Sequence, residues 1–399
     1  MSGEPRTTSR AQGPARLPKL ALLWVMVCIG GFAALWFPSF REKLLAVEYW
    51  TSDWRTALLS DRTAANHSRI AVVLFDPTSA PGRSYLPVPR DYHARLIHAL
   101  AAAQPAIIGL DFYFLQETDL ESDRVFKETI RDANAKIVIG AVNEGLKQFT
   151  AKQFAYQKQF LADVGRSGGD ISLNFAEDHV TRRTYDASKD LQFPETFARL
   201  IARLAGAQVA GVPQEIHIGW LWGARSNPYP FLTVTAQDLL SEQPRALDLL
   251  AQMKGKVVLV GLNFPYFDQH RTPLSVATKE GMLGVMIHSQ MIAQLLDNRI
   301  YSELGLRSMA GFLAGVILAG LVLGWIFWKH TSLLGQSIAA VTLVSLDAVL
   351  YYFLRIYLPL TPALYVWFLA VLAGSNFRVL VDWMKERRSA GREFAVQSA

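Results

Sequence analysis

Four long apolar runs stand out in the pattern of hydrophobic and polar positions along the chain. They cover residues 20–37, 309–328, 332–354 and 358–377. A hydrocarbon core about 30 Å thick is crossed by roughly 20 apolar residues in a helix, so each run is predicted to be a transmembrane helix. Short polar separators divide the last three runs, as is typical of helices that follow one another closely. The pattern therefore predicts four membrane spans.

The first run has a competing interpretation. It follows a polar leader, residues 1–19, that carries Arg6, Arg10, Arg16 and Lys19. A basic leader before an apolar core also marks a cleaved signal peptide. However, the run is longer than the usual core of a signal peptide, and Trp36 and Phe37 differ from the small residues of a cleavage site. A retained membrane anchor is the favoured interpretation.

Residues 42–306 show a different pattern, in which short apolar stretches alternate with amphipathic ones. The stretches typical of strands are 69–75, 106–112, 136–142, 215–220 and 256–262. The stretches with helical spacing are 90–103, 123–133, 197–204, 234–241 and 284–296. Strands that are apolar throughout and alternate with helices are typical of a parallel sheet covered on both faces. We therefore predict an α/β domain with a mainly parallel sheet and a less regular insertion around residues 145–195.

The excess of positive charge lies at the two ends of the chain. There are 40 basic and 34 acidic residues in total, but segment 42–306 is close to neutral and the tail 378–399 is basic. Basic residues beside membrane spans favour the cytoplasm, and both ends can be cytoplasmic only if the number of spans is even. The α/β domain is therefore expected to lie outside the cytoplasm. The same distribution argues against a nucleic-acid-binding face.

Few residues carry a recognisable catalytic or metal-binding pattern. The single cysteine, Cys28, excludes a disulfide framework, and the eight histidines form no metal-binding motif. Residues 165–169 match the Gly-x-Ser-x-Gly pattern of serine hydrolases around Ser167, but no helix is predicted after the serine, so a flexible loop is favoured. We therefore expect no metal, no cofactor and no enzymatic activity.

Several stretches of the chain resemble the type-2 CHASE domain, an extracytoplasmic sensory module of bacterial signalling proteins. The matching stretches are IAVVLFDPTS at 70–79, LPVPRDYHARLIHAL at 86–100, AIIGLDFYF at 106–114, GKVVLVGLN at 255–263 and GVMIHSQMIAQLL at 284–296. In that family one span precedes the domain and three usually follow it, as the apolar runs do here. The resemblance implies a multi-pass protein of the bacterial inner membrane, with its large domain in the periplasm or outside the cell.

The chain departs from this family pattern in two ways. Family members often continue into a kinase or cyclase domain, but only 22 residues follow Phe377, fewer than the ~50 residues of a small domain. The chain is therefore expected to be a standalone member that acts through a membrane partner. The second departure is Asp76-Pro77, where the family often has two carboxylates. It weakens any ligand or metal scheme that needs a pair of carboxylates there.

Polar residues at the predicted strand ends are the candidates for ligand binding. Open parallel sheets bind ligands beyond the carboxyl ends of their strands. Six polar residues follow such strands or begin the next helices: Asp76, Arg90, Asp111, Asn263, Arg271 and His288. They are predicted to form a pocket for an anionic or polar small molecule, in which Asp76, Asp111 and Arg90 meet. The alternative is that the two aspartates cap turns or helices and that Arg90 pairs with one of them.

The apolar runs contain small residues at four-residue spacing and one formal charge. The residues considered for helix packing or partner contact are Gly311, Gly315, Ala319, Gly320, Gly324 and Asp347. Small residues let helices approach closely, so packing within the helical bundle is the favoured role. A carboxylate within a span is costly, and three interpretations of Asp347 are open: an interfacial position, a contact in the bundle, and proton transport.

The sequence thus predicts a membrane-anchored sensory module, whose exported domain binds a small ligand or a protein. Its partner would be another membrane protein or a larger complex that carries the output. A structural subunit of such a complex, with no signalling role, is the alternative.

Overall fold

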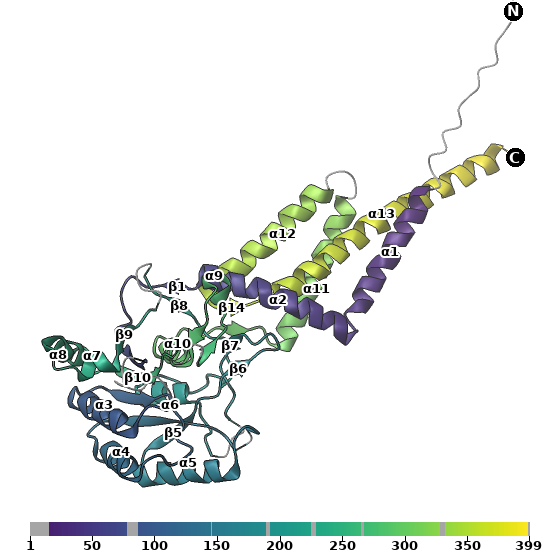
Figure 1. The fold of residues 1–399 in the computed structure, drawn as a ribbon. Coiled ribbons are helices and arrows are strands. Elements are labelled where there is room, and N and C mark those ends of the chain that lie inside the picture. Colours follow the sequence, from purple (N-terminus) through teal and green to yellow (C-terminus); the bar gives the residue numbers. More distant parts are fainter. Residues whose placement is uncertain are drawn as a thin grey trace, which may run out of the picture. The chain divides into compact units, whose positions relative to one another are not determined.

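The computed structural model describes residues 16–77, 87–144, 146–188, 192–224, 229–264, 267–327 and 332–397. Most of the predicted leader and the separator 329–331 lie outside these residues. The chain divides into an α/β unit, Asp53–Ser302, and a helical unit made of Met1–Ser52 and Glu303–Ala399. Figure 1 shows the elements of both units.

The α/β unit is built on a six-stranded sheet in which every pair of neighbours is parallel. Its strand order is β5-β4-β3-β10-β2-β9. The strands are β2 (Ile70–Phe75), β3 (Ile107–Leu110), β4 (Ile137–Ala141), β5 (Ser167–Asp170), β9 (Leu232–Thr235) and β10 (Val257–Leu262). The predicted mainly parallel sheet is confirmed.

Helices cover both faces of this sheet, which explains why its central strands are apolar throughout. Alternate residues of β2 belong to two separate cores: Val72 lies in one and Val73 in the other. The first core is closed by α6 (Phe197–Leu204) and α10 (Gly284–Leu296). The second is closed by α3 (Arg90–Ala102), α4 (Leu120–Asp132), α5 (Ala151–Val164), α7 (Ala236–Leu240) and α8 (Pro244–Ala251). Successive side chains of a strand point to opposite faces, so both sets must be apolar here.

The remaining elements of the α/β unit are short. They are β1 (Asp61–Arg62), β6 (Asn174–Phe175), β7 (Thr181–Arg183), β8 (Leu221–Trp222), β11 (Gln269–His270), α9 (Ser275–Thr278), β12 (Met282–Leu283) and β13 (Ser302–Glu303). Three of the pairs they form are β1 with β8, β6 with β7, and β11 with β12.

The predictions of a less regular insertion around residues 145–195 and of a flexible loop at 165–169 are partly wrong. Within 145–195 the chain forms α5 and the edge strand β5, so the Gly-x-Ser-x-Gly segment is a strand from Ser167 and not a flexible loop. Its Ser-Gly-Gly-Asp sequence has low strand propensity, and pairing with β4 outweighs it. Gly169 lets α6 come close, since a Cβ there would lie 2.6 Å from Phe197 Cα.

Two other predicted elements differ in detail. The stretch 234–241 begins as the end of β9, and the helix α7 starts only at Ala236 because Thr235 caps it through a reciprocal pair with Asp238. Residues 215–220 contain single bridges at His217 and no regular strand.

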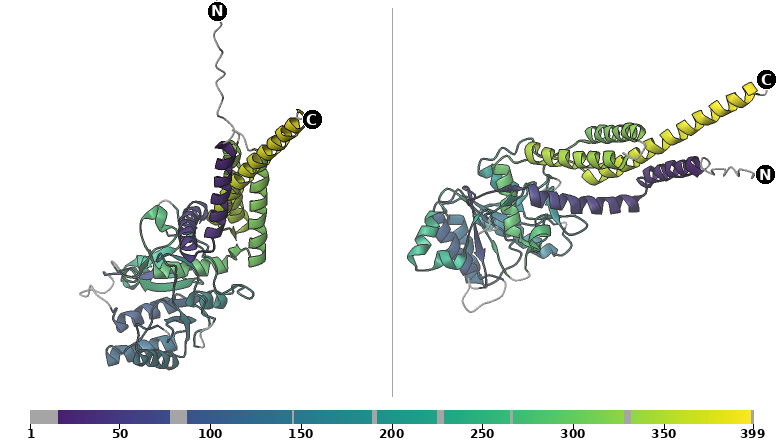
Figure 2. Two further views of the ribbon diagram at one scale, coloured as in Figure 1. Left: turned by 90° about the vertical axis from the view of Figure 1, so that its right-hand side faces the viewer. Right: turned by 90° about the horizontal axis from the view of Figure 1, so that it is seen from above.

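Among its described residues, the helical unit contains three helices that are long and apolar enough to cross a membrane: Leu306–Ile326, Gln336–Leu354 and Leu360–Ser389. They belong to α11 (Leu306–Ile326), to α12 (Ser332–Val349) with the π-helix Leu350–Leu354, and to α13 (Leu360–Gln397); β14 (Ile356–Tyr357) lies between the last two. Figure 2 shows α13 as one long yellow helix. It continues through most of the segment predicted as a separate basic tail.

The first predicted span is not a single straight helix. α1 (Arg16–Ala34) and α2 (Pro38–Leu59) are bent by 85° at a short break, and only together do they pass as one span. Pro38 explains the break, because a proline disfavours helical backbone at the residue before it. Three spans are therefore clear, and the predicted fourth is present only if this bent pair counts as one.

Candidate functional site

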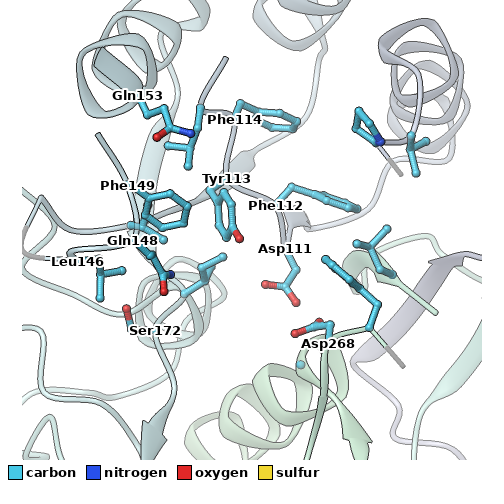
Figure 3. A pocket seen from close by; sticks show the side chains of 18 of the residues that line it. Asp111, Phe112, Tyr113, Phe114, Leu146, Gln148, Phe149, Gln153, Ser172 and Asp268 are labelled. Carbon is cyan, nitrogen blue, oxygen red and sulfur yellow. The ribbon is translucent and has the colours of Figure 1, made fainter. Parts of the chain in front are cut away.

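A pocket of about 800 Å³ opens at the carboxyl edge of the sheet in the α/β unit. Its walls come from the segments that follow β3, β4, β5 and β10, and from the first turns of α3 and α10. Figure 3 shows side chains from these segments pointing into a common space. Loops at this edge converge because all the strands run in the same direction, which is why open parallel sheets bind ligands there.

Two carboxylates lie together in this pocket. Asp111 directly follows β3, and its backbone N–H donates to Val260 O at 2.9 Å. Asp268 lies in the loop after β10, and Figure 3 shows its carboxylate next to that of Asp111. Gly284, at the start of α10, leaves room for Asp268, because a Cβ there would lie 2.6 Å from Asp268 Oδ2. The loop is tied to the helix by Gly284 N–H, which donates to Asp268 O at 3.0 Å.

Burial and the neighbouring charge control the ionisation of Asp111. Burial, and then the charge of Asp268, raise the pKa of Asp111 well above its ordinary value. Burial lowers the pKa of His288 to about 4, so this imidazole is neutral at pH 7. Its Nε2 lies 3.7 Å from Asp111 Oδ1, beyond hydrogen-bond distance. His270 Nε2 is 2.8 Å from Asp268 Oδ1.

Aromatic side chains form much of the remaining wall. Tyr113 and Phe149 meet edge to face, with ring centroids 5.3 Å apart, and Figure 3 shows Tyr113 beside Asp111 with Phe149 on its other side. Burial and the nearby aspartates raise the pKa of Tyr113, so its hydroxyl stays protonated at neutral pH. Phe112, Phe175 and Phe267 also line the pocket. The site therefore combines apolar walls with a few polar groups, as small-molecule sites usually do.

Arg90 lies at another side of the pocket, at the start of α3. Its Nε donates to Asp123 Oδ1 at 3.1 Å, and both side chains are buried. Asp123 also accepts hydrogen bonds from the backbone and hydroxyl of Thr118. The guanidinium carbon lies 4.3 Å from the ring centre of Phe114. Arg90 is thus held by an ion pair within the fold.

Three of the six predicted ligand residues line the pocket and three do not. Arg90, Asp111 and His288 line it, whereas Asp76, Asn263 and Arg271 are absent from its wall. The predicted meeting of Asp76, Asp111 and Arg90 is wrong in this respect. The reason is the strand order: β10 lies between β2 and β3, so the strands that end at Asp76 and Asp111 are not neighbours. Arg90 pairs with Asp123, so the predicted alternative, in which it pairs with Asp76 or Asp111, is also wrong.

The sequence pattern did not point to Asp268, His270 or the aromatic pair of Tyr113 and Phe149 as pocket residues. The only available signal was the Asp-x-His spacing at 268–270, directly after an apolar strand. Such spacing is common, and it indicates a site here only because α10 approaches the same strand end.

The small residues of α11 fall on two different faces. Gly320 and Gly324 face α13: a Cβ on Gly320 would lie 2.8 Å from Ala370 Cβ, and one on Gly324 would overlap the backbone of Val371. Gly311 and Gly315 have no atom of the described chain within 4 Å of such a Cβ, and Ala319 is exposed. Asp347 is buried on α12. One face of α11 is therefore packed within the unit and the other is open.

Comparison with known protein families agrees with this arrangement of domain and helices. The model of the CHASE2 domain matches residues 23–328, most of the chain. The chain belongs to the CHASE2 family. CHASE2 domains are an extracytoplasmic sensory family, so the chain is consistent with a sensory module, and its apolar helices fit a membrane protein. No curated protein and no solved structure shows significant similarity to the chain.

Proposed function

We propose that this CHASE2 protein is a membrane-anchored sensor whose exported domain binds a small molecule in the pocket at the sheet edge. The observation that carries the proposal is the pocket itself, which joins two buried or half-buried carboxylates to aromatic walls. Both termini are proposed to be cytoplasmic in a bacterial inner membrane, because the basic residues are concentrated there. The protein is proposed to have no catalytic activity of its own; the placement of Ser167 on an edge strand, and not at a turn before a helix, supports this.

A chain of contacts runs from the pocket to helix α2. Asp268 and His270 lie on the segment that ends at Arg271, whose carbonyl accepts a hydrogen bond from Thr181 N–H at 2.9 Å. The next residue, Arg182, binds both carboxylate oxygens of Asp53 on α2 at 2.7 Å. Ligand contact with Asp268 is therefore proposed to shift the position of α2 through β7. Since α2 follows α1, this helix is the proposed route of the signal toward the membrane.

A tryptophan that fills the pocket tests the proposed ligand site. Ser172 lines the pocket, and its N–H donates to the carboxylate of Asp170. The N–H of Ser188 donates to Asp186 in the same way, but Ser188 is an exposed residue that is not part of the pocket wall. A small-molecule extract of the source cells should raise the melting temperature of the full chain in nanodiscs. The expected rise is about 3–5 °C when the extract contains the ligand at about ten times its Kd. Ser188→Trp should keep this rise and Ser172→Trp should lose it. Equal rises in both variants would exclude this pocket.

The output is proposed to pass to a membrane protein that contacts the open face of α11. Gly311→Leu with Gly315→Leu should fill that face without touching α13, and the recovery of co-purifying membrane proteins should fall at least about fivefold. Ala310→Leu with Ala314→Leu, on exposed neighbouring positions, is the matched control and should keep wild-type recovery. If both pairs of substitutions keep it, α11 does not form the contact.

A further inference from the structure

The pocket carries negative charge that no basic side chain balances. Its lining includes three formally charged residues, Arg90, Asp111 and Asp268. Arg90 is already paired with the buried Asp123, so it does not serve the other two. Within the described chain, the only ion-pair partners of Asp111 and Asp268 are the histidines His288 and His270. A histidine is not a permanent cation, so neither carboxylate has an arginine or lysine partner among the described residues.

A buried and weakly bonded imidazole lies at the same place. The side chain of His288 is 3% exposed, and its Nδ1 has no hydrogen bond of normal geometry with the described residues, although a contact with the backbone of Ile171 raises its pKa slightly. Buried polar atoms are nearly always well hydrogen-bonded, so a weakly bonded one in a pocket wall favours a ligand or a water there. With its pKa lowered to about 4, His288 offers this site a neutral imidazole and no positive charge.

The walls of the pocket favour an organic cation over a metal ion. A calcium ion requires six to eight oxygen ligands, and no group of three metal-ligating side chains occurs in the described part of the chain. By contrast, Tyr113 lies beside Asp111, and Phe149 extends this aromatic wall on the other side of Tyr113. Aromatic rings attract ammonium groups and also bury hydrocarbon. The volume of about 800 Å³ is ample for a small molecule of this kind.

We propose that the pocket binds a small organic amine, with its ammonium group between Asp111 and Asp268 and its carbon skeleton against Tyr113 and Phe149. This inference rests on the proposed sensory function and names the class of its ligand. In the empty protein the two carboxylates repel each other, and Asp111 retains its proton to higher pH. An ammonium group takes the place of that proton and donates hydrogen bonds to both carboxylates.

Calorimetry on the full chain in nanodiscs at pH 8 tests the proposal with three pairs of probes. The pairs are butylamine and butanol, 2-phenylethylamine and 2-phenylethanol, and putrescine and butanediol. At least one amine should bind at least tenfold more tightly than its alcohol, because a charge-assisted hydrogen bond in a buried site is stronger than a neutral one. Equal affinity within all three pairs would overturn the proposal. Binding of phenylacetate, or of calcium or magnesium alone, in preference to every amine would also overturn it.

Two isosteric variants locate the ammonium group. Asp111→Asn and Asp268→Asn should each weaken amine binding at least tenfold and leave the alcohols unaffected. Asp76→Asn, at the end of a strand outside the pocket, is the matched control and should bind as wild type does. Asp111→Asn removes a charge whose burial is costly, so this variant should melt at a higher temperature than wild type at pH 8. A loss of binding in a more stable protein cannot result from unfolding.

The pH dependence gives an independent readout. The titratable or charged residues that line the pocket with Asp111 are Asp268 and His270 in the loop after β10, His288 on α10, Tyr113 after β3, and Arg90 and His93 on α3. Amine affinity should rise with increasing pH as Asp111 loses its proton, and Asp111→Asn should flatten most of that rise. An unchanged rise in the variant would contradict the proposed position of the ammonium group. If no amine is preferred but the small-molecule extract still stabilises wild type and not Ser172→Trp, the cation is wrong and the sensory function stands.

Discussion

Asp53→Ala is expected to lower the free energy of unfolding of the α/β unit by about 3 kcal/mol, the usual cost of breaking a buried ion pair at one end. Asp53 and Arg182 are 7% and 6% exposed, and two hydrogen bonds of 2.7 Å join them. Without Asp53 the guanidinium loses a buried carboxylate, and Asp178, another of its ion-pair partners, is half-exposed. Denaturant unfolding of the full chain, followed by tryptophan fluorescence, measures the change.

Two further variants separate pairing from charge burial. Asp178→Ala should cost about 1 kcal/mol or less, because exposed pairs contribute little. Asp53→Leu combined with Arg182→Leu should cost less than Asp53→Ala, since no buried charge is left unpaired. If the double variant is less stable than Asp53→Ala, the pair itself stabilises α2 against the sheet and this explanation is wrong.

The second large effect is a loss of stability on acidification. His93 is buried among Phe75, Phe112 and Phe126, and burial lowers its pKa to about 3. In the unfolded chain a histidine takes up a proton near pH 6.5, but folded His93 does not until about pH 3. Its contribution to stability is therefore complete above pH 6.5 and is lost as the pH falls. The expected loss is about 3 kcal/mol between pH 6.5 and pH 4.

His93→Phe should remove this contribution and keep the aromatic packing. His288, with a pKa of about 4, also contributes stability that is lost as the pH falls. Asp111 has a raised pKa, so its contribution to stability increases as the pH falls. The variant should therefore reduce the acid-induced loss without abolishing it. His98→Phe, on the exposed side of the same helix, is the matched control and should follow wild type. Identical pH profiles for His93→Phe and wild type would refute the assignment.

The central strands could be predicted because burial on both faces leaves a continuous apolar run. This holds for β2 and β10, whose residues are almost all buried. The edge strand β5 could not be predicted, because Ser-Gly-Gly-Asp forms a strand only through its partner β4. The order of strands was also hidden: β10 follows β2 by about 180 residues in the chain and yet lies beside it.

The same long-range placement limits the prediction of the pocket. Asp111 and His288 could be named because each follows a strand or begins a helix at the correct edge. Asp268 could not, because it is brought to Asp111 by α10 and by the positive φ of 53° in its own loop. Asp76 was a plausible candidate on the same local grounds, and it is separated from Asp111 only because β10 lies between β2 and β3.

The most direct test of a sensor with this route of signal is hydrogen exchange of the full chain in nanodiscs, with and without the small-molecule extract. Ligand binding should slow exchange in residues 111–118 and 267–271 around the pocket, and also in 178–183 and the end of α2, residues 53–59. Ser188→Trp should reproduce this pattern and Ser172→Trp should show none of it. Slowed exchange at the pocket alone, with no change at residues 53–59, would contradict coupling through Arg182 and Asp53. No change anywhere in wild type would contradict the account as a whole.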